Sequence, residues 1–124
     1  MLLVEEKPDF DYFLRGADGA SALVNDRRLA KSFIITPERL IEGWAPATLA
    51  ELDIAAINSV LAQNPEVIIL GSGAQQGFPS AEVMAACLQR GIGIESMANA
   101  AAARTFNVLA GEGRKVVAGF LLGA

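Results

Sequence analysis

The sequence contains no histidine and only one cysteine. Without an imidazole the chain has no Ser-His-Asp or Cys-His catalysis and no histidine ligand for zinc or iron. The single Cys87 cannot form a disulfide within the chain, and it lies at helical spacing from the apolar Val83, Met84 and Leu88. We therefore expect Cys87 to be a small buried side chain rather than a reactive thiol.

Long apolar runs and an excess of positive charge are also missing. Although 52% of the residues are hydrophobic, no run approaches the roughly 20 residues that cross a bilayer, so we expect a soluble chain without a membrane span. Ten Lys and Arg against 14 Asp and Glu give a net charge of -4, which would repel a nucleic acid. The chain begins without the basic segment of a secretory or transit peptide, and this predicts a cytoplasmic location.

The length of 124 residues suits one domain. We expect residues 1–9 to form a flexible lead-in, because they mix charges with proline and show no period, and residues 10–124 to form a single α/β domain. Two short apolar segments within residues 12–24 flank a glycine-containing turn signal, which predicts a β-hairpin. Residues 32–36 are rich in β-forming side chains. The N-terminal third should therefore be antiparallel β-structure.

Helix and strand signals alternate in the rest of the chain. Strands are predicted for the apolar stretches at residues 67–70, 92–96 and 115–122. Helical spacing predicts helices in the second half of residues 48–63, from near Ser80 to Gly91, and over residues 100–110, the last capped by Asn99. The strand–helix–strand unit over residues 67–97 should be parallel. Together these patterns predict a three-layer α/β fold, with a mostly parallel or mixed central sheet flanked by helices and an antiparallel β-rich N-terminal part.

A glycine-rich loop at residues 71–77 connects the strand at residues 67–70 to the helix that begins near Ser80. Such a loop lies at the carboxyl edge of the sheet, where open α/β sheets bind ligands. The spacing of Gly71, Gly73 and Gly77 is one residue longer than the dinucleotide fingerprint, although Glu95 stands where a ribose-binding acid would stand. The sequence therefore predicts no nucleotide or other cofactor.

The polar residues near this loop do not form a recognisable catalytic set. Ser72 lies between two glycines as a nucleophile could, but no histidine can activate it, so we interpret it as a turn residue. Glu95 allows two interpretations: a buried charge pair with Arg104 or Arg114, or an unpaired acid–base group with a raised pKa. No catalytic or metal-binding residue is predicted. Trp44, the only tryptophan, is expected to cover the edge of the core, the alternative being a surface for ligand stacking.

Several segments resemble, in the same order, a small uncharacterised α/β family whose eukaryotic relatives include a mitochondrial respiratory complex I assembly factor and an adipogenesis-associated protein. These segments are residues 69–73, 78–79, 91–97, 104–109 and 112–116. The family usually has threonine where Ser72 and Asn99 stand, and tyrosine where Phe106 stands. The resemblance implies a three-layer α/β fold and participation in protein assembly, but it implies no established activity.

Two functions of different classes stay open. The first is a non-enzymatic interaction or assembly module with a protein partner, which predicts an exposed apolar patch. The second is a binder or enzyme for a small polar molecule at the glycine-loop edge, which predicts a concave pocket. The oligomeric state is open as well. For either function the candidate binding residues are Gly71, Ser72, Gly73, Gln75, Glu95, Met97 and Asn99, bordered by Arg104 and Asn107.

Overall fold

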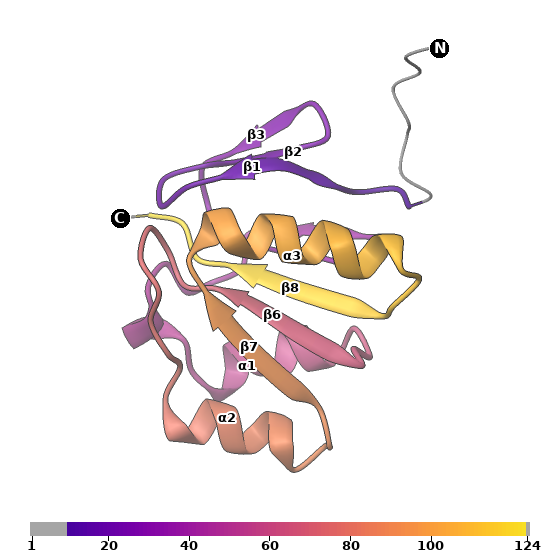
Figure 1. The fold of residues 1–124 in the computed structure, drawn as a ribbon. Coiled ribbons are helices and arrows are strands. Elements are labelled where there is room, and N and C mark those ends of the chain that lie inside the picture. The colour runs from indigo at the N-terminus through magenta and orange to yellow at the C-terminus, as the bar shows by residue number, and fades with distance from the viewer. Residues whose placement is uncertain (1–9, 124) are drawn as a thin grey trace.

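The computed structural model describes residues 10–123 as two β-sheets and three α-helices (Figure 1). The larger sheet has five strands in the order β5-β4-β8-β6-β7. Its strands are β4 (Phe33–Ile35), β5 (Leu40–Glu42), β6 (Val67–Gly71), β7 (Gly93–Met97) and β8 (Val116–Phe120). β6 pairs in parallel with β7 and β8, whereas β4 runs antiparallel to β5 and β8. The expected mixed central sheet is confirmed, and the lead-in expected at residues 1–9 lies outside the described residues.

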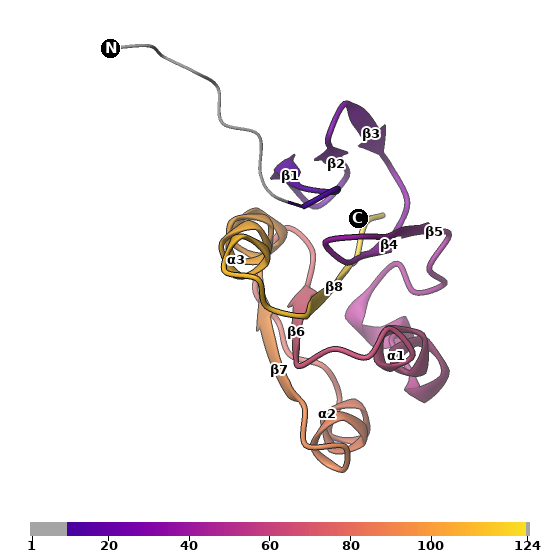
Figure 2. The same cartoon turned by 90° about the vertical axis from the view of Figure 1, so that its right-hand side faces the viewer.

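Helices cover both faces of the central sheet (Figure 2). On one face α3 (Asn99–Gly111) lies between the central sheet and the smaller N-terminal sheet. On the other face lie α1 (Ile54–Leu61) and α2 (Ala81–Leu88). This arrangement confirms the layered α/β fold that the sequence predicts.

The N-terminal sheet is a three-stranded antiparallel meander made of β1 (Leu14–Ala17), β2 (Ala22–Val24) and β3 (Arg27–Leu29). In the turn between β1 and β2, the Asp18 carboxylate accepts the N–H groups of Ser21 and Ala20, each at 2.8 Å. These two bonds lower the pKa of Asp18 from its ordinary value, because they favour the charged form. The predicted hairpin is therefore confirmed, with its turn fixed by an aspartate side chain.

The first two helices begin at residues whose side chains cap them. Asp53 accepts the N–H of Ala56 at 2.8 Å, and Ser80 accepts the N–H of Val83 at 3.3 Å. Each cap satisfies a backbone donor that has no partner within the helix. The segment before α1 forms only a 3-10 turn (η1, Leu49–Glu51), so the predicted helix within residues 48–63 occupies its second half, as expected.

The prediction that Asn99 caps α3 is wrong. Ala98 holds the cap position without a side-chain bond, and Asn99 is the first residue of the helix. The Asn99 side chain is completely buried and bonds to other segments instead. Buried backbone groups gain more from a partner than the first-turn N–H groups of a helix, which water can reach.

The strand–helix–strand unit over residues 67–97 has the predicted geometry. β6 and β7 pair in parallel from Val67 opposite Gly93 to Gly71 opposite Met97, and α2 connects them. β8 lies between β4 and β6 and is buried along its whole length. The central position predicted for the C-terminal strand from its continuous apolar character is therefore confirmed.

Two apolar cores fill the spaces on either side of the central sheet. On the α3 face, the rings of Phe33 and Phe120 stack with centroids 5.1 Å apart, and Phe106 packs in the same cluster. On the other face, Ile57 and Cys87 have no exposed surface. Burial raises the pKa of the Cys87 thiol, so the predicted inert, buried role of this residue agrees with its surroundings.

Trp44 packs against the backbone of β8 at Gly119. Its side chain is 7% exposed, and its indole Nε1 donates to the carbonyl of Ala56 in α1 at 3.0 Å. The ring lies directly over Gly119, where a Cβ atom would come within 2.6 Å of Trp44 Cη2. Trp44 therefore covers the edge of the core, as expected, and it can do so because residue 119 has no side chain.

The contact predicts that Gly119→Ala destabilises the protein by about 1–3 kcal/mol, since a rigid ring must move away from the added methyl group. Because Trp44 is the only tryptophan, its fluorescence should also shift to longer wavelength as the ring becomes more exposed. Chemical denaturation followed by fluorescence measures both effects. Gly93→Ala in β7 is the matched control, because nothing lies within 4 Å of its added Cβ. Equal stability of the two variants would contradict the prediction.

Candidate functional site

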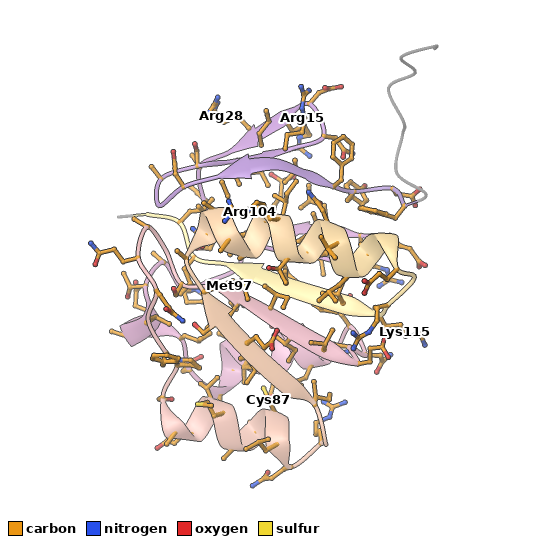
Figure 3. All side chains as sticks on the ribbon, viewed as in Figure 1. Arg15, Arg28, Cys87, Met97, Arg104 and Lys115 are labelled. Atoms are coloured by element: carbon orange, nitrogen blue, oxygen red, sulfur yellow. The ribbon has the colours of Figure 1, made fainter. Side chains whose placement is uncertain are left out.

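The glycine loop leaves β6 at the carboxyl edge of the sheet, where β7 also ends and α3 begins. Six of the nine candidate residues gather at this edge: Gly71, Ser72, Gly73, Gln75, Met97 and Asn99. Figure 3 shows Met97 at the end of β7 and Arg104 on α3 above it. The parallel pairing of β6 with β7 brings these segments together, as the sequence predicts.

Asn99 is the centre of the hydrogen bonds at this edge. Its Oδ1 accepts the N–H of Gly73 at 3.1 Å, and its Nδ2 donates to the carbonyls of Asp18 and Leu121 at 2.8 and 2.9 Å. A Cβ atom at Gly71 would overlap Asn99 Oδ1. The amide therefore joins the glycine loop, the β1–β2 turn and the segment after β8, and Gly71 leaves the space for it.

The Ser72 hydroxyl holds the glycine loop closed. It accepts the N–H of Gly77 at 3.0 Å and lies within donating distance of the carbonyls of Gln75 and Met97, at 2.8 and 3.1 Å. One hydroxyl offers a single hydrogen and two acceptor positions, so these contacts use its hydrogen and one acceptor position. This geometry favours the interpretation of Ser72 as a turn residue over that of a nucleophile.

Glu95 does not form the buried charge pair that was one of the two interpretations offered by the sequence. It is exposed on β7, and it has no ion pair with any residue between 10 and 123. Arg114 instead pairs with Glu66 at 3.2 Å. Arg104 is exposed on α3. The candidate residues Glu95 and Arg104 are available to a partner, but neither is held in place by a described ion pair.

Asn107 faces away from the glycine loop. Its side chain accepts the N–H of Leu14 at 2.9 Å and donates to the Leu14 carbonyl at 2.6 Å. The Asn107 amide therefore pairs with the Leu14 backbone as the peptide group of a neighbouring strand would, and it joins β1 to α3. The expectation that Asn107 borders the loop has no support in this geometry, because α3 turns its side chain toward the N-terminal sheet.

An exposed aromatic residue follows the loop. Phe78 is 70% exposed, and on α2 the side chains of Leu88 and Met84 are 66% and 37% exposed. The exposure of Phe78 is not predicted from the sequence, where this residue belongs only to the segments that resemble the family. The available signal was an aromatic residue between a glycine and a proline, outside any amphipathic period.

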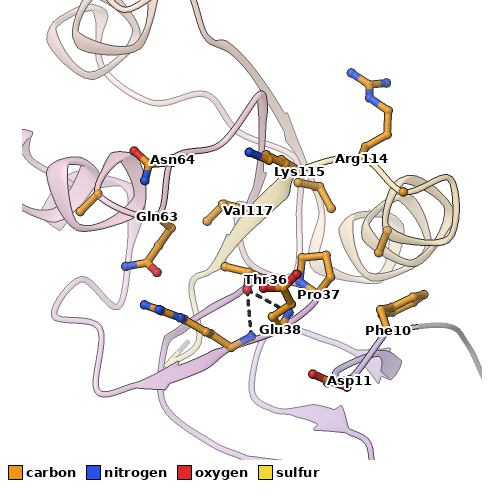
Figure 4. A pocket seen from close by; sticks show the side chains of 15 residues that line it. Phe10, Asp11, Thr36, Pro37, Glu38, Gln63, Asn64, Arg114, Lys115 and Val117 are labelled. Carbon is orange, nitrogen blue, oxygen red and sulfur yellow. Dashed lines mark hydrogen bonds between the residues drawn. The ribbon is translucent and has the colours of Figure 1, made fainter.

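A cavity of about 780 Å³ lies at the opposite edge of the sheet, beside the amino ends of β6 and β8 (Figure 4). Lys115 extends toward Gln63 and Asn64, whereas Arg114, which also lines the cavity, directs its guanidinium outward. Glu66 accepts the N–H of Lys115 at 2.9 Å and the Nε–H of Arg114, and these bonds hold the pKa of Glu66 below its ordinary value. None of the nine candidate residues lines this cavity or a smaller one of about 490 Å³ beside Trp44.

The fold and the site define a layered α/β domain whose glycine loop is an internally bonded connection between a strand and a helix. The chain belongs to the family described as protein of unknown function (DUF498/DUF598), which it matches over residues 15–121. The family resemblance expected from the sequence is confirmed to this extent. The links to complex I assembly and to adipogenesis are not part of what the match establishes.

Solved structures agree with this assignment. The chain is 54% identical to the XCC1710 protein of Xanthomonas campestris, covering 99% of this chain and 93% of that chain with a TM-score of 0.84. It is 25% identical to a Bordetella pertussis protein that is a Mth938-like domain, covering 98% and 92% of the two chains with a TM-score of 0.81. The Mth938-like fold is therefore shared.

One curated relative comes from Francisella tularensis and is called a 13 kDa major membrane protein. It is 35% identical over 60 residues, which are 48% of this chain and 49% of that protein. The matched part thus spans about half the length of this relative.

The geometry predicts that Asn99→Ala destabilises the protein by about 2–4 kcal/mol, because the buried carbonyl of Leu121 and two partly buried backbone groups lose their partner. Thermal or urea unfolding measures the change. Gln75→Ala is the control in the same loop, since its side chain is exposed, and it should change stability by no more than about 0.5 kcal/mol. A cost for Asn99→Ala as small as that of the control would mean that the three bonds are not important for stability.

Proposed function

We propose that this chain is a non-enzymatic interaction module of the assembly-factor type. It binds a protein partner along the outer side of the glycine loop, at the carboxyl edge of the central sheet, and along α2, which leads from this edge back to the amino end of β7. The resemblance to the family that includes a respiratory complex I assembly factor and an adipogenesis-associated protein supports this role. More specifically, we propose that the partner is a protein of a respiratory complex.

The observation that carries the proposal is the exposure of three large apolar side chains, Phe78, Met84 and Leu88, which together are called the Phe78–Leu88 surface. These are three of the five large apolar side chains exposed on the described residues. All three belong to the single segment that runs from the glycine loop through α2. Exposed apolar side chains that gather on one segment favour a protein contact over chance exposure. An assembly module is the function that predicts such a surface.

The polar residues of the loop support contact rather than chemistry. Gly73 N–H and the Ser72 hydroxyl already have partners inside the protein, and the sequence has no histidine to act as a base. Gln75, Glu95 and Arg104 stay exposed around the loop. Gln75 can form part of the polar rim that surrounds the apolar centre of most protein interfaces, whereas Arg104 lies on α3, on the other face of the sheet from α2.

The cytoplasmic location expected from the sequence stays a prediction. The Francisella relative carries the name of a membrane protein, whereas none of the helices between residues 10 and 123 is long and apolar enough to cross a bilayer. Fractionation of the native host, followed by detection of the chain in each fraction, determines its location directly.

The double change Phe78→Ser and Leu88→Ser tests the proposed partner surface. It should abolish recovery of specific partners when the tagged chain is purified from its native host and analysed by quantitative mass spectrometry, because exposed apolar anchors contribute most of the energy of a contact. Folding stability should change by no more than about 0.5 kcal/mol per site.

The matched control is Val108→Ser, which removes a 59% exposed apolar side chain from α3, on the other face of the sheet. The control should retain every partner that the unaltered chain recovers. If the double variant retains the same partners as the control, the Phe78–Leu88 surface is not the contact and the proposal fails.

A small polar ligand is the second candidate function, and the 780 Å³ cavity favours it. Its volume lies within the range of about 300–1,000 Å³ that is common for ligand sites, but the cavity is at the edge opposite the glycine loop.

If a small polar ligand binds in this cavity, a screen of polar fragments by protein-observed NMR should shift the amide signals of Gln63, Asn64 and Lys115. Lys115→Ala should weaken such binding about tenfold, and Arg114→Ala, which removes a guanidinium that is directed outward and bonded to Glu66, should weaken it less. Shifts confined to residues 71–77 would return the ligand site to the loop.

A further inference from the structure

The edge strand β5 has backbone groups that no other described strand uses. β5 is the outermost strand of the central sheet and pairs only with β4. Thr36 N–H donates to the carbonyl of Arg39 across the turn that joins β4 and β5. Since hydrogen-bonded pairs alternate along an antiparallel ladder, Ile41 bonds to β4, whereas Leu40 and Glu42 direct their N–H and C=O groups outward. An extended chain can add to this edge as a sixth strand.

A groove runs beside these outward-facing groups. Its volume is about 490 Å³, and it is lined by residues of β5 and α1. Ile41 and Trp44 line it from the sheet side, and Ala56 lines it from α1. Trp44 is held rigidly by its bond to the Ala56 carbonyl. A strand added to β5 would place alternate side chains into this groove, where they would find an apolar floor that is already formed.

The charged side chains that line the groove are both acidic. Glu51 and Asp53 stand at its rim, and no lysine or arginine lines it. Each carboxylate has one short-range partner, the Thr48 hydroxyl for Glu51 and the Ala56 N–H for Asp53. Neither forms an ion pair with any residue between 10 and 123. The rim therefore favours a positively charged occupant.

We propose that the groove between β5 and α1 binds an extended basic peptide segment of another protein by strand addition. The backbone of the peptide pairs with Leu40 and Glu42, an apolar side chain enters the groove beside Trp44, and lysine or arginine side chains two positions away on either side approach Glu51 and Asp53. This surface is separate from the Phe78–Leu88 surface, because it borders the opposite edge strand of the sheet. The proposed peptide binding goes beyond the proposed function, and it does not depend on that function being correct.

The only tryptophan of the chain lies in this groove, so its fluorescence reports directly on occupancy. The probe is the peptide Lys-Thr-Val-Thr-Lys, acetylated and amidated at its ends, titrated into the full chain at low ionic strength. We expect a saturable change in Trp44 emission. The matched peptide Glu-Thr-Val-Thr-Glu should bind at least about fivefold more weakly, because it brings like charges to the rim.

Two sets of variants separate the roles of charge and backbone. Glu51→Gln combined with Asp53→Asn removes both charges while asparagine keeps the helix cap, and affinity for the lysine peptide should fall about fivefold. Glu42→Pro removes an outward N–H without breaking the ladder to β4, and should weaken binding about fivefold. Glu42→Gln is its control, because it also loses the ion pair with Arg27 but keeps the N–H, and it should bind like the unaltered chain.

Several results would overturn the proposal. Absence of any Trp44 response to the lysine peptide is one, and equal binding of the two peptides is another. A response to protein concentration alone, with dimers seen by analytical ultracentrifugation, would assign the groove to a second copy of this chain. If Glu42→Pro does not fold, the charge variant, which keeps the helix cap and every backbone bond, still distinguishes the outcomes.

Discussion

The structure depends on one buried amide, the side chain of Asn99. It binds Gly73 in the glycine loop, Asp18 in the β1–β2 turn and Leu121 after β8, three segments that are far apart in the sequence. No strand ladder reaches these three backbone groups, and a buried group without a partner costs about 1–3 kcal/mol. The amide supplies one acceptor and two donors, which is the combination that the site requires. The N-terminal sheet is thereby attached to the carboxyl edge of the central sheet.

This use of the glycine loop determines where function can reside. In a nucleotide-binding α/β domain, the N–H groups of the loop point at a phosphate. Here Gly73 donates to Asn99 and Gly77 donates to Ser72, so the loop bonds to the protein itself. What it offers to another molecule is its outer side, where Gln75 and Phe78 are exposed. The loop therefore holds exposed side chains in place and does not use these backbone N–H groups to bind a ligand.

The two edge strands of the central sheet differ in how they are protected. On β7 the charged Glu95 is exposed, and Gln76 donates to the Ser96 carbonyl at 3.3 Å. The bonded carbonyl of Ser96 is no longer available to an added strand. β5 has only its neighbour β4 on one side and an apolar groove beside Trp44 on the other. An added strand could therefore pair with the free backbone groups of β5 and also insert its side chains into the groove. Both features together distinguish an edge that binds peptides from an edge that is only exposed.

The sequence by itself determined the order and kind of most elements, because these follow from local patterns. The aliphatic run at residues 67–70 and the Ser80 cap indicated the parallel β6–α2–β7 unit, and the continuous apolar C-terminal strand indicated a central position. Net charge and the missing histidine limited the chemistry in the same way. Only the tertiary structure decided what the polar residues do. Asn99 looked like a helix cap and Glu95 like a buried acid, because the partners of a side chain depend on segments far away in the sequence, 81 residues in the bond from Asn99 to Asp18 and 93 in the bonds from Asn107 to Leu14. The groove beside β5 and the Phe78–Leu88 surface were hidden for the same reason, since exposure is a property of what packs nearby and not of residue type.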